Sequence, residues 1–331
     1  MVRLKRVART DLTLTRRKSG RGFTFVDETG AAIRDPEVRQ RILQLGIPPA
    51  WKDVRIAAHA RAHIQALGVD EAGRTQYIYH ADWELRRTGR KQQRLTQLTA
   101  ALPRIRRAVA KELAGEAGSR TFALALAVAL IDRTAMRVGR ERYLETSGTR
   151  GAGTLFTRDV TVRDGKLHLR FSAKGSKKAE YDIDDPALVD AVQRIKTLPG
   201  KRLLVYRDAS GKIRPINTAS INAWLCQIGG CDISAKDFRT LHASALAAEA
   251  LAALELPTSV TARKRQIAGV VRQISEVLRN TPAICRKSYI APCLFKLYDE
   301  GKLQPMWSTA GRGAPGLKMR ERRLATVLAA V

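Results

Sequence analysis

The longest apolar stretch of the sequence is a run of ten residues from Phe122 to Ile131, which ends at Asp132. It falls well short of the ~20 apolar residues that a membrane-spanning helix needs. Because the run is apolar on every side, a helix formed by it must be surrounded by other elements of the chain. The chain has 331 residues, 44% of them hydrophobic, which is enough for a sizeable core and roughly two domains. Wholesale disorder is therefore excluded.

Basic residues outnumber acidic ones throughout the chain, with 60 Lys and Arg against 31 Asp and Glu and a net charge of +29 at pH 7. This excess repels itself unless a polyanion neutralises it, and nucleic acid is the natural partner because its binding releases condensed counterions. A generally basic surface without a specific partner is the alternative. Aromatic residues make up only 5%, which argues against a basic amphipathic helix on a membrane surface.

The four cysteines form no C-x-x-C pair, and the five histidines do not flank them at zinc-ligand spacing. Reduced cysteines in a cytoplasmic protein are the simplest interpretation. There is no G-x-x-x-x-G-K-[ST] motif, so no nucleotide cofactor is expected. The acidic residues form no obvious metal-binding cluster, and we expect neither a metal ion nor another cofactor.

The pattern of elements predicts an α+β protein with two domains, residues 1–89 and 90–331. The first is small and mixed: short strands are predicted at 23–26, 54–57 and 76–80, and Asp35 with Pro36 begins a helix that ends before Gly46. A stretch dense in Arg, Lys and Gln follows from Leu85 to Arg107. We place the boundary at Gly89 within this stretch, which is either a basic hinge or an ordinary solvated helix.

The second domain is predicted to be larger and mostly helical. Ser119 can cap a long helix over residues 120 to about 146. On this helix Arg133, Arg137 and Arg140 stand at i, i+4 and i+7 and would share one face.

A three-stranded antiparallel sheet is expected next, because three short segments alternate with period two. These are Val160/Val162, Leu167/Leu169/Phe171 and Tyr181/Ile183, with turns at Asp164-Gly165 and at Lys174 to Lys178. From Pro186 onward the chain is expected to be mainly helical, with helices near 216–228, 241–254 and 266–279.

Three features could carry chemistry, although each has an ordinary structural interpretation when taken alone. Arg137 on a polar helix face is usually solvated or ion-paired, and Lys174 at a hairpin tip is usually solvated. Arg239-Thr240-Leu241-His242 opens one helix, and Tyr289 lies about two turns into another, where a tyrosine is more often a packing residue. Together, basic side chains from three segments and one tyrosine are what a metal-free phosphoryl-transfer site requires.

Six segments, in this order, resemble the type IB DNA topoisomerases, in particular the compact poxvirus-like bacterial group. They run from about residue 20 to 300. Each segment alone is weak evidence for the resemblance, but six of them in the same order are specific. The segments are Ile47-Pro48-Pro49-Ala50-Trp51-Lys52-Asp53-Val54, Gln76-Tyr77-Ile78-Tyr79-His80, Arg137-Val138-Gly139, Phe171-Ser172-Ala173-Lys174-Gly175, Lys236-Asp237-Phe238-Arg239-Thr240 and Lys287-Ser288-Tyr289.

This resemblance implies a monomeric cytoplasmic enzyme, associated with the nucleoid, that relaxes supercoiled duplex DNA through a 3′-phosphotyrosyl intermediate without ATP or metal. The family's two arginines, lysine and tyrosine fall on Arg137, Arg239, Lys174 and Tyr289. Its usual histidine, nine residues before the tyrosine, is replaced by Asn280. An amide can donate a hydrogen bond to a phosphate but cannot become cationic. His242 is the rival candidate for this role.

The resemblance also implies that the N-terminal domain clamps DNA. The residues expected to contact DNA are Gln76, Tyr77, Tyr79, Arg133, Arg140, Lys177 and His242. Two other functions stay open. A tyrosine site-specific recombinase shares the Arg239-x-x-His242 pattern, but its N-terminal domain is mostly helical. A non-catalytic DNA-binding protein would explain the charge but would leave the proposed catalytic set without a purpose.

Overall fold

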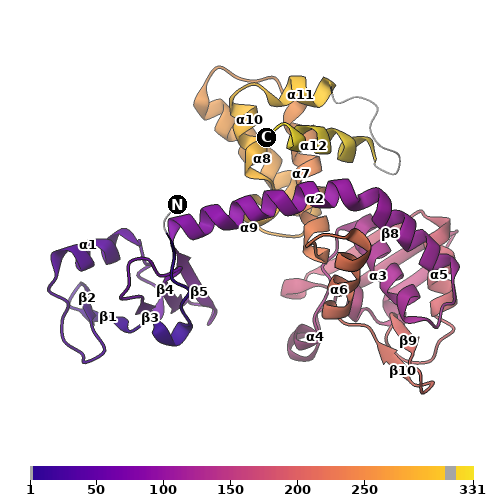
Figure 1. Ribbon diagram of the computed structural model, residues 1–331, viewed down its shortest axis with the longest axis horizontal. Coiled ribbons are helices and arrows are strands. Elements are labelled where there is room, and N and C mark those ends of the chain that lie inside the picture. Colours follow the sequence, from indigo (N-terminus) through magenta and orange to yellow (C-terminus); the bar gives the residue numbers. More distant parts are fainter. Residues whose placement is uncertain (1–2, 310–317) are drawn as a thin grey trace. The chain divides into compact units, whose positions relative to one another are not determined.

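The structure is a computed structural model that describes residues 3–309 and 318–331. The chain divides into two compact units, Met1–Arg90 and Lys91–Val331 (Figure 1). The first is built on a sheet, and the second consists mostly of helices with a smaller sheet. The predicted α+β class is confirmed. No helix among the described residues is long and apolar enough to cross a bilayer.

The first unit contains a five-stranded antiparallel sheet with the strand order β2-β1-β3-β4-β5. Its strands are β1 (Leu14–Ser19), β2 (Gly22–Val26), β3 (Lys52–Ile56), β4 (Ile64–Val69) and β5 (Thr75–Tyr79), and a short 3₁₀ helix (Arg9–Asp11) precedes them. The sequence pattern indicated β2, β3 and β5. It did not indicate β1, whose basic residues obscure the alternation, or β4.

Helix α1 (Pro36–Gln44) begins where the sequence predicted it. The Oδ1 atom of Asp35 accepts hydrogen bonds from the backbone N–H groups of Glu37 and Val38, at 2.8 and 3.2 Å. Pro36 fits the first helical position because no hydrogen-bond donor is needed there. The buried Ile42 side chain packs into a core formed mainly by strand residues Leu14, Phe25, Val54, Ile56 and Ala66.

Helix α2 (Ala81–Ala114) is continuous through Gly89 and Pro103. The basic stretch from Leu85 to Arg107, which was interpreted as either a basic hinge or an ordinary helix, is therefore helical throughout. From residue 95 onward its apolar side chains recur every three or four residues and are buried. They are Leu95, Leu98, Leu102, Ile105 and Val109, which join the core of the second unit.

Helix α3 (Arg120–Thr134) carries the long apolar run, which is almost entirely buried, and Ser119 caps it as predicted. The helix ends at Thr134, so the predicted single helix to about residue 146 is wrong. Thr134 ends it because its Oγ1 accepts a hydrogen bond from the backbone of Met136, while Ala135 adopts a left-handed φ of 52°. A separate helix, α4 (Glu141–Ser147), follows.

The predicted shared face of Arg133, Arg137 and Arg140 is consequently absent: the first lies on α3, the second in the connecting segment, and the third directly before α4. Two glycines explain why the chain leaves the helix. The N–H groups of Ala152 and Gly153 donate to the carbonyls of Arg137 and Val138, at 2.9 and 2.7 Å. A Cβ on Gly151 would overlap the Arg137 carbonyl, and one on Gly139 would overlap Thr154 Oγ1, so only glycine permits this approach.

The predicted three-stranded meander is confirmed, with the order β6-β7-β8 and antiparallel pairing. Its strands are β6 (Val160–Arg163), β7 (Lys166–Ser172) and β8 (Lys178–Ile183). A small hairpin that the sequence pattern did not predict follows, formed by β9 (Val205–Arg207) and β10 (Ile213–Pro215). Short 3₁₀ turns lie at Ala152–Thr154, Thr157–Asp159 and Lys174–Ser176.

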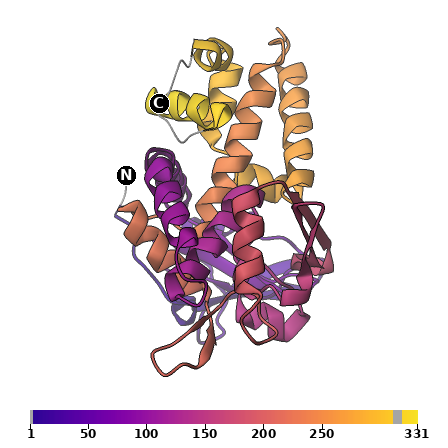
Figure 2. The same cartoon turned by 90° about the vertical axis from the view of Figure 1, so that its right-hand side faces the viewer.

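The remaining helices follow the predicted helical character of the C-terminal half. They are α5 (Pro186–Ile195), α6 (Thr218–Gly229), α7 (Ala235–Ala252), α8 (Val260–Val277), α9 (Pro282–Ser288), α10 (Pro292–Asp299), α11 (Leu303–Thr309) and α12 (Met319–Ala329). Helices α7 and α8 lie side by side (Figure 2). The helices expected near 216–228, 241–254 and 266–279 correspond to α6, α7 and α8.

Helix α12 is joined to α2 and α3 by a buried ion-pair network. The Arg106 guanidinium contacts Asp132 at 2.8 Å and Glu321 at 2.7 Å. The two acidic residues are only 5% and 4% exposed. Their charges are therefore compensated inside the protein rather than by water.

Candidate active site

A cavity of about 240 Å³ in the second unit is lined by Arg137, Lys174, Arg239 and Tyr289. These residues come from the segment between α3 and α4, the β7–β8 hairpin, helix α7 and the end of helix α9, respectively. The fold thus gathers four side chains that are far apart along the chain. Arg140, one of the residues expected to contact DNA, lines the same cavity.

Tyr289 is held at the C-terminal end of α9. Thr281 caps this helix, because its Oγ1 accepts a hydrogen bond from the backbone N–H of Ile284 at 3.4 Å, and Pro282 occupies the first helical position. At the other end, the N–H of Tyr289 donates to the carbonyl of Cys285 at 3.0 Å. The predicted helix start therefore places the tyrosine two turns later, half-buried at the cavity wall.

Arg239 packs against Tyr289 and is only 4% exposed. Its guanidinium carbon lies 4.8 Å from the centre of the tyrosine ring. The guanidinium donates to the carbonyls of Ala135 and Leu278, and these bonds fix its orientation. Its Nε is buried and has no hydrogen-bond partner within the described part of the chain. A buried donor of this kind needs an acceptor, and a phosphate oxygen would provide one.

The positive charges around Tyr289 favour its phenolate. Burial alone would raise the pKa of the phenol, but Arg239, Arg137 and Lys236 outweigh it and hold the pKa below the ordinary tyrosine value. The phenol is therefore easier to ionise than a tyrosine in water, which suits a nucleophile.

Arg137 is bonded to Asn280, the residue at the position expected for a histidine. An Arg137 Nη2–H group donates to the Asn280 side-chain oxygen. The asparagine is itself held by a hydrogen bond from its backbone N–H to the Ser275 carbonyl, at 2.8 Å. Burial and then the charge of Arg239 lower the pKa of Arg137, as expected where positive charges are concentrated. Asn280 therefore contacts a cavity residue directly.

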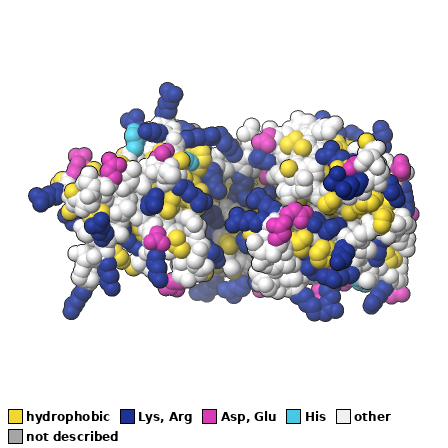
Figure 3. Space-filling model, turned by 90° about the horizontal axis from the view of Figure 1, so that it is seen from below, with side chains coloured by type: hydrophobic (Ala, Val, Ile, Leu, Met, Phe, Trp, Pro, Cys, Tyr) yellow, Lys and Arg dark blue, Asp and Glu magenta, His cyan; other side chains and the backbone are white. Residues whose placement is uncertain are grey.

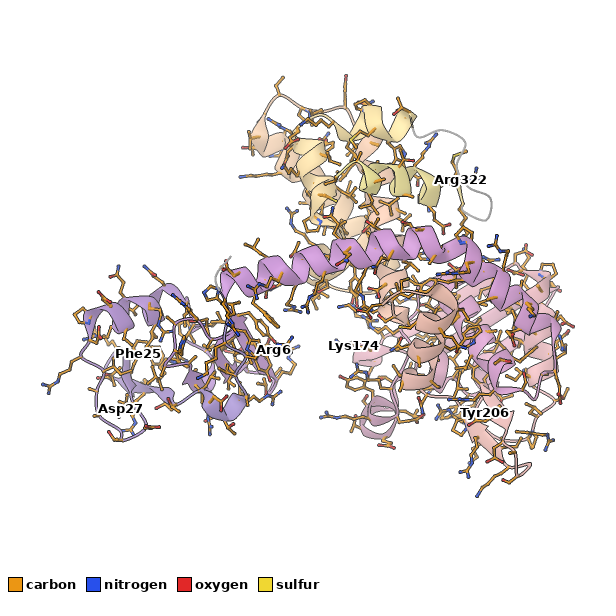
Figure 4. All side chains as sticks on the ribbon, in the orientation of Figure 1. Arg6, Phe25, Asp27, Lys174, Tyr206 and Arg322 are labelled. Atoms are coloured by element: carbon orange, nitrogen blue, oxygen red, sulfur yellow. The ribbon has the colours of Figure 1, made fainter. Side chains whose placement is uncertain are left out.

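Lys174 lies at the end of the β7–β8 hairpin, where Figure 4 labels it. It is exposed, and Gly175 after it has a left-handed φ of 75°. Lys177 closes the same turn, because its carbonyl accepts a hydrogen bond from the N–H of Ala173 at 2.8 Å. The side chain of Lys174 borders the cavity on a flexible stem.

His242 and Arg133 line a different groove, of about 430 Å³. The His242 Nε2 atom is hydrogen-bonded to the backbone carbonyl of Asp132 at 2.8 Å. Burial lowers the pKa of this histidine although Asp132 opposes the shift. The Arg133 guanidinium is paired with Asp185 at 2.7 Å. Neither residue borders the cavity that Tyr289 lines.

The residues predicted on β5 belong to the first unit. The rings of Tyr77 and Tyr79 are stacked, with centres 5.8 Å apart. Arg9 and Arg87 lie over these two rings, each 5.2 Å from the ring centre. The Gln76 amide donates to Asp70 at 2.8 Å. Alternating guanidinium and aromatic groups form a surface suited to bases and phosphates.

Lys236 belongs to one of the six matching segments but was not among the predicted site residues, and it lines the cavity 5.8 Å from the centre of the Tyr289 ring. It precedes Arg239 by three residues. Side chains three residues apart lie on the same face of a helix, so this spacing on α7 could have indicated that Lys236 faces the cavity. Tyr143, Thr149 and Arg150 also border the cavity without having been expected. Nothing in their local sequence indicated this position.

Basic side chains are not confined to the cavity lining, because the chain carries 60 Lys and Arg residues. Figure 3 shows Lys and Arg side chains spread over the face in view, with fewer Asp and Glu between them. Among residues 3–309 and 318–331 no group of three or more His, Cys, Asp or Glu side chains could hold a metal ion. The four cysteines are free.

The chain is similar to known proteins over most of its length. Residues 81–298 match the family described as eukaryotic DNA topoisomerase I, catalytic core, and residues 22–70 match the N-terminal domain of bacterial DNA topoisomerase IB. The chain is 28% identical to the DNA topoisomerase 1B of Acanthamoeba polyphaga mimivirus, over 86% of this chain and 87% of the viral protein. It is 21% identical to the DNA topoisomerase 1B of Vaccinia virus (strain Copenhagen), over 86% and 89%.

The first of these family matches extends over more than half of the chain and includes all four cavity residues. The chain belongs to the type IB DNA topoisomerase family. It is therefore a DNA topoisomerase, and its substrate is DNA.

Proposed function

We propose that this protein relaxes supercoiled duplex DNA by cutting and resealing one strand through a covalent bond to Tyr289. The observation that carries this proposal is the cavity lined by Arg137, Lys174, Arg239 and Tyr289. A phosphodiester transfer without a metal requires a nucleophile, cations that stabilise the transition state and a proton donor. Tyrosine, two guanidinium groups and a lysine supply these groups around one cavity.

In the forward step the phenol oxygen of Tyr289 attacks a backbone phosphorus. A bond forms between that oxygen and phosphorus, and the bond from phosphorus to the 5′ oxygen of the next nucleotide breaks. The phenol proton leaves to solvent, and the positive charges around the ring lower the free energy of the phenolate. The departing 5′ oxygen takes a proton from Lys174, which acts as general acid.

The two arginines stabilise the five-coordinate transition state. Arg239 is oriented by its two carbonyl partners, and its Nε donor has no partner among the described residues. Arg137 is oriented by Asn280. Because both guanidiniums are fixed before DNA binds, they need little reorganisation when negative charge develops on the phosphate.

Religation is the same reaction in reverse: the 5′ hydroxyl attacks the phosphotyrosine, and Tyr289 leaves. The covalent link conserves the energy of the broken phosphodiester, so neither ATP nor a metal ion is required. Between the two steps the free end rotates about the intact strand and supercoils are lost.

The first unit contributes DNA contacts through Gln76, Tyr77 and Tyr79, and Arg140 and Lys177 contribute others beside the cavity. The enzyme acts as a monomer at the nucleoid in the cytoplasm.

A plasmid assay tests the proposal. Purified protein should relax a supercoiled plasmid in EDTA and without ATP, and it should do so on plasmids of unrelated sequence. Activity confined to one DNA site, with strand exchange between two such sites, would instead indicate a recombinase. Duplex binding without any relaxation would indicate a non-catalytic DNA-binding protein.

A further inference from the structure

Lys91 on helix α2 is hydrogen-bonded to the segment that carries Tyr289. The Nζ of Lys91 donates hydrogen bonds to the backbone carbonyls of Lys287 and Ile290, at 3.1 and 2.9 Å. These two carbonyls lie on either side of the tyrosine in the chain. The end of helix α9 therefore lies against this part of α2.

One of these carbonyls, that of Lys287, lies in the last turn of α9, and the other, that of Ile290, lies just beyond the helix end. The last carbonyls of a helix have no partner within the helix, and they form the negative end of its dipole. An ammonium group has three donors and no acceptor, so it can satisfy both carbonyls at once.

The other side of the same segment is held by a neutral contact. The hydroxyl of Ser244 on α7 donates to the Tyr289 carbonyl at 3.2 Å and accepts from the N–H of Ala291 at 3.0 Å. The backbone around the tyrosine is thus held by two residues: Lys91, which is charged, and Ser244, which is neutral. Lys91 does not itself line the cavity that Tyr289 borders.

We propose that Lys91 is a positioning residue for the nucleophile. Its ammonium group donates hydrogen bonds to the carbonyls of Lys287 and Ile290 and thereby orients the phenol of Tyr289 for attack on the phosphate. The proposal rests on the proposed function. It assigns Lys91 a role through the protein backbone and not through DNA, although the residue is a lysine in a strongly basic chain.

The surroundings of Lys91 are those of a lysine engaged with protein. Burial, followed by the charge of Lys236, lowers its pKa to about 8, while Cys293 has a smaller opposing effect. Lys236 lines the cavity beside Tyr289, so this ammonium is held close to other positive charge. A lysine whose only role was to attract phosphate would be more stable in open solvent, where its charge is hydrated.

The test compares Lys91→Met with Lys111→Met, which removes an equal charge from an exposed position in the last turn of the same helix. Two quantities are measured for each variant. One is the rate of covalent adduct formation with enzyme in excess over DNA. The other is the dissociation constant for duplex DNA, measured in a Tyr289→Phe background so that no chemistry intervenes.

Lys91→Met should slow adduct formation by about 10- to 100-fold, because a small displacement of a reacting group has effects of this size. Its DNA affinity and the salt dependence of binding should match those of Lys111→Met. Lys91→Arg, which keeps the charge and several donors, should recover most of the lost rate. Thermal unfolding of each variant shows whether the fold is intact.

Equal adduct rates in the two methionine variants would overturn the proposal. So would a loss of DNA affinity in Lys91→Met that accounts for the whole loss of rate, since Lys91 would then be a phosphate contact. Absence of any adduct with the wild-type protein would instead refute the proposed function itself, which separates the two failures.

Discussion

The guanidinium carbon of Arg239 lies 4.8 Å from the centre of the Tyr289 ring, and both side chains border one cavity. The arginine is buried and is held by two backbone carbonyls, so its position relative to the ring is fixed by the fold. A cation in this position favours the phenolate and, in the proposed reaction, would face the phosphate that the phenolate attacks.

Arg239→Lys tests whether the forked geometry matters in addition to the charge. Lysine keeps the positive charge but cannot donate to two carbonyls and a phosphate in one plane. We expect adduct formation to slow by about 10²- to 10³-fold, the usual effect of removing an oriented donor from a transition state. DNA affinity should change little. A variant that cleaves at the wild-type rate would show that charge alone is sufficient.

The pH dependence of cleavage tests the lowered pKa of Tyr289. Because the pKa of this phenol is lowered, the phenolate fraction at a given pH exceeds that of a free tyrosine. The rate of adduct formation should rise with pH and level off before the ordinary tyrosine pKa of about 10. Lys236→Gln removes one of the charges responsible, so the inflection should move to higher pH.

The matched control for this measurement is Lys264→Gln on α8, which removes an exposed lysine that does not line the cavity. Its pH profile should overlay that of the wild type. An inflection that is the same in all three proteins would mean that Lys236 does not act on the phenol.

Asn280→His tests which residue takes the role of the family's usual histidine. A protonated imidazole forms a stronger, charge-assisted hydrogen bond to a phosphate than an amide does. Adduct formation should therefore be faster in this variant at pH 6 than at pH 8, relative to the wild type, because a histidine with a pKa near 6.5 is charged only at the lower pH. Asn280→Ala should be slower than the wild type, since Arg137 loses a partner.

His242 provides the contrast. Its Nε2 is already bonded to the Asp132 carbonyl, away from the cavity. His242→Asn should therefore affect cleavage less than Asn280→Ala does. The reverse order, in variants with normal thermal stability, would transfer the role to His242.

The ion-pair network of Arg106 should contribute to the stability of the protein by joining helix α12 to α2 and α3. Glu321→Gln leaves a buried guanidinium with one carboxylate in place of two, and we expect a loss of about 3 kcal/mol in the free energy of unfolding. The control is Asp232→Asn, which breaks a pair with Arg94 whose carboxylate is largely exposed and should cost less than about 1 kcal/mol. Denaturant unfolding measures both values.

The same network predicts how stability depends on pH. Burial would raise the pKa of Asp132, but Arg106 outweighs burial and holds it below the ordinary value. The stabilisation is therefore present above the unfolded pKa of about 4 and is lost as the pH falls through the lower folded pKa. Stability that does not change between pH 6 and pH 3 would contradict this.

Local signals in the sequence predicted the elements whose ends are set by neighbouring residues. Asp35 and Thr281 cap α1 and α9 with their side chains, and a proline follows each of them at the first helical position, so the start of each helix was predictable from neighbouring residues. The alternation of the three meander strands was equally local. The fold class followed from these elements.

Features that depend on contacts between residues far apart in the sequence could not be predicted from local sequence patterns. The end of α3 at Thr134 depends partly on the close approach of Gly139 and Gly151, which belong to different segments. The cavity was anticipated only through a resemblance, because no spacing rule brings Lys174 to Tyr289. Lys91 was missed because it binds backbone carbonyls, and these have no sequence signature.

The most direct test of the central claim is to trap the covalent adduct and identify the residue that carries it. The protein is incubated with labelled duplex DNA, denatured, digested with protease and analysed by mass spectrometry. We predict a 3′-phosphate of the DNA on Tyr289, lost in Tyr289→Phe and kept in Tyr298→Phe, which alters a buried tyrosine bonded to Gln266. An adduct on Tyr298 or any other residue, or relaxation by Tyr289→Phe at the wild-type rate, would contradict the account.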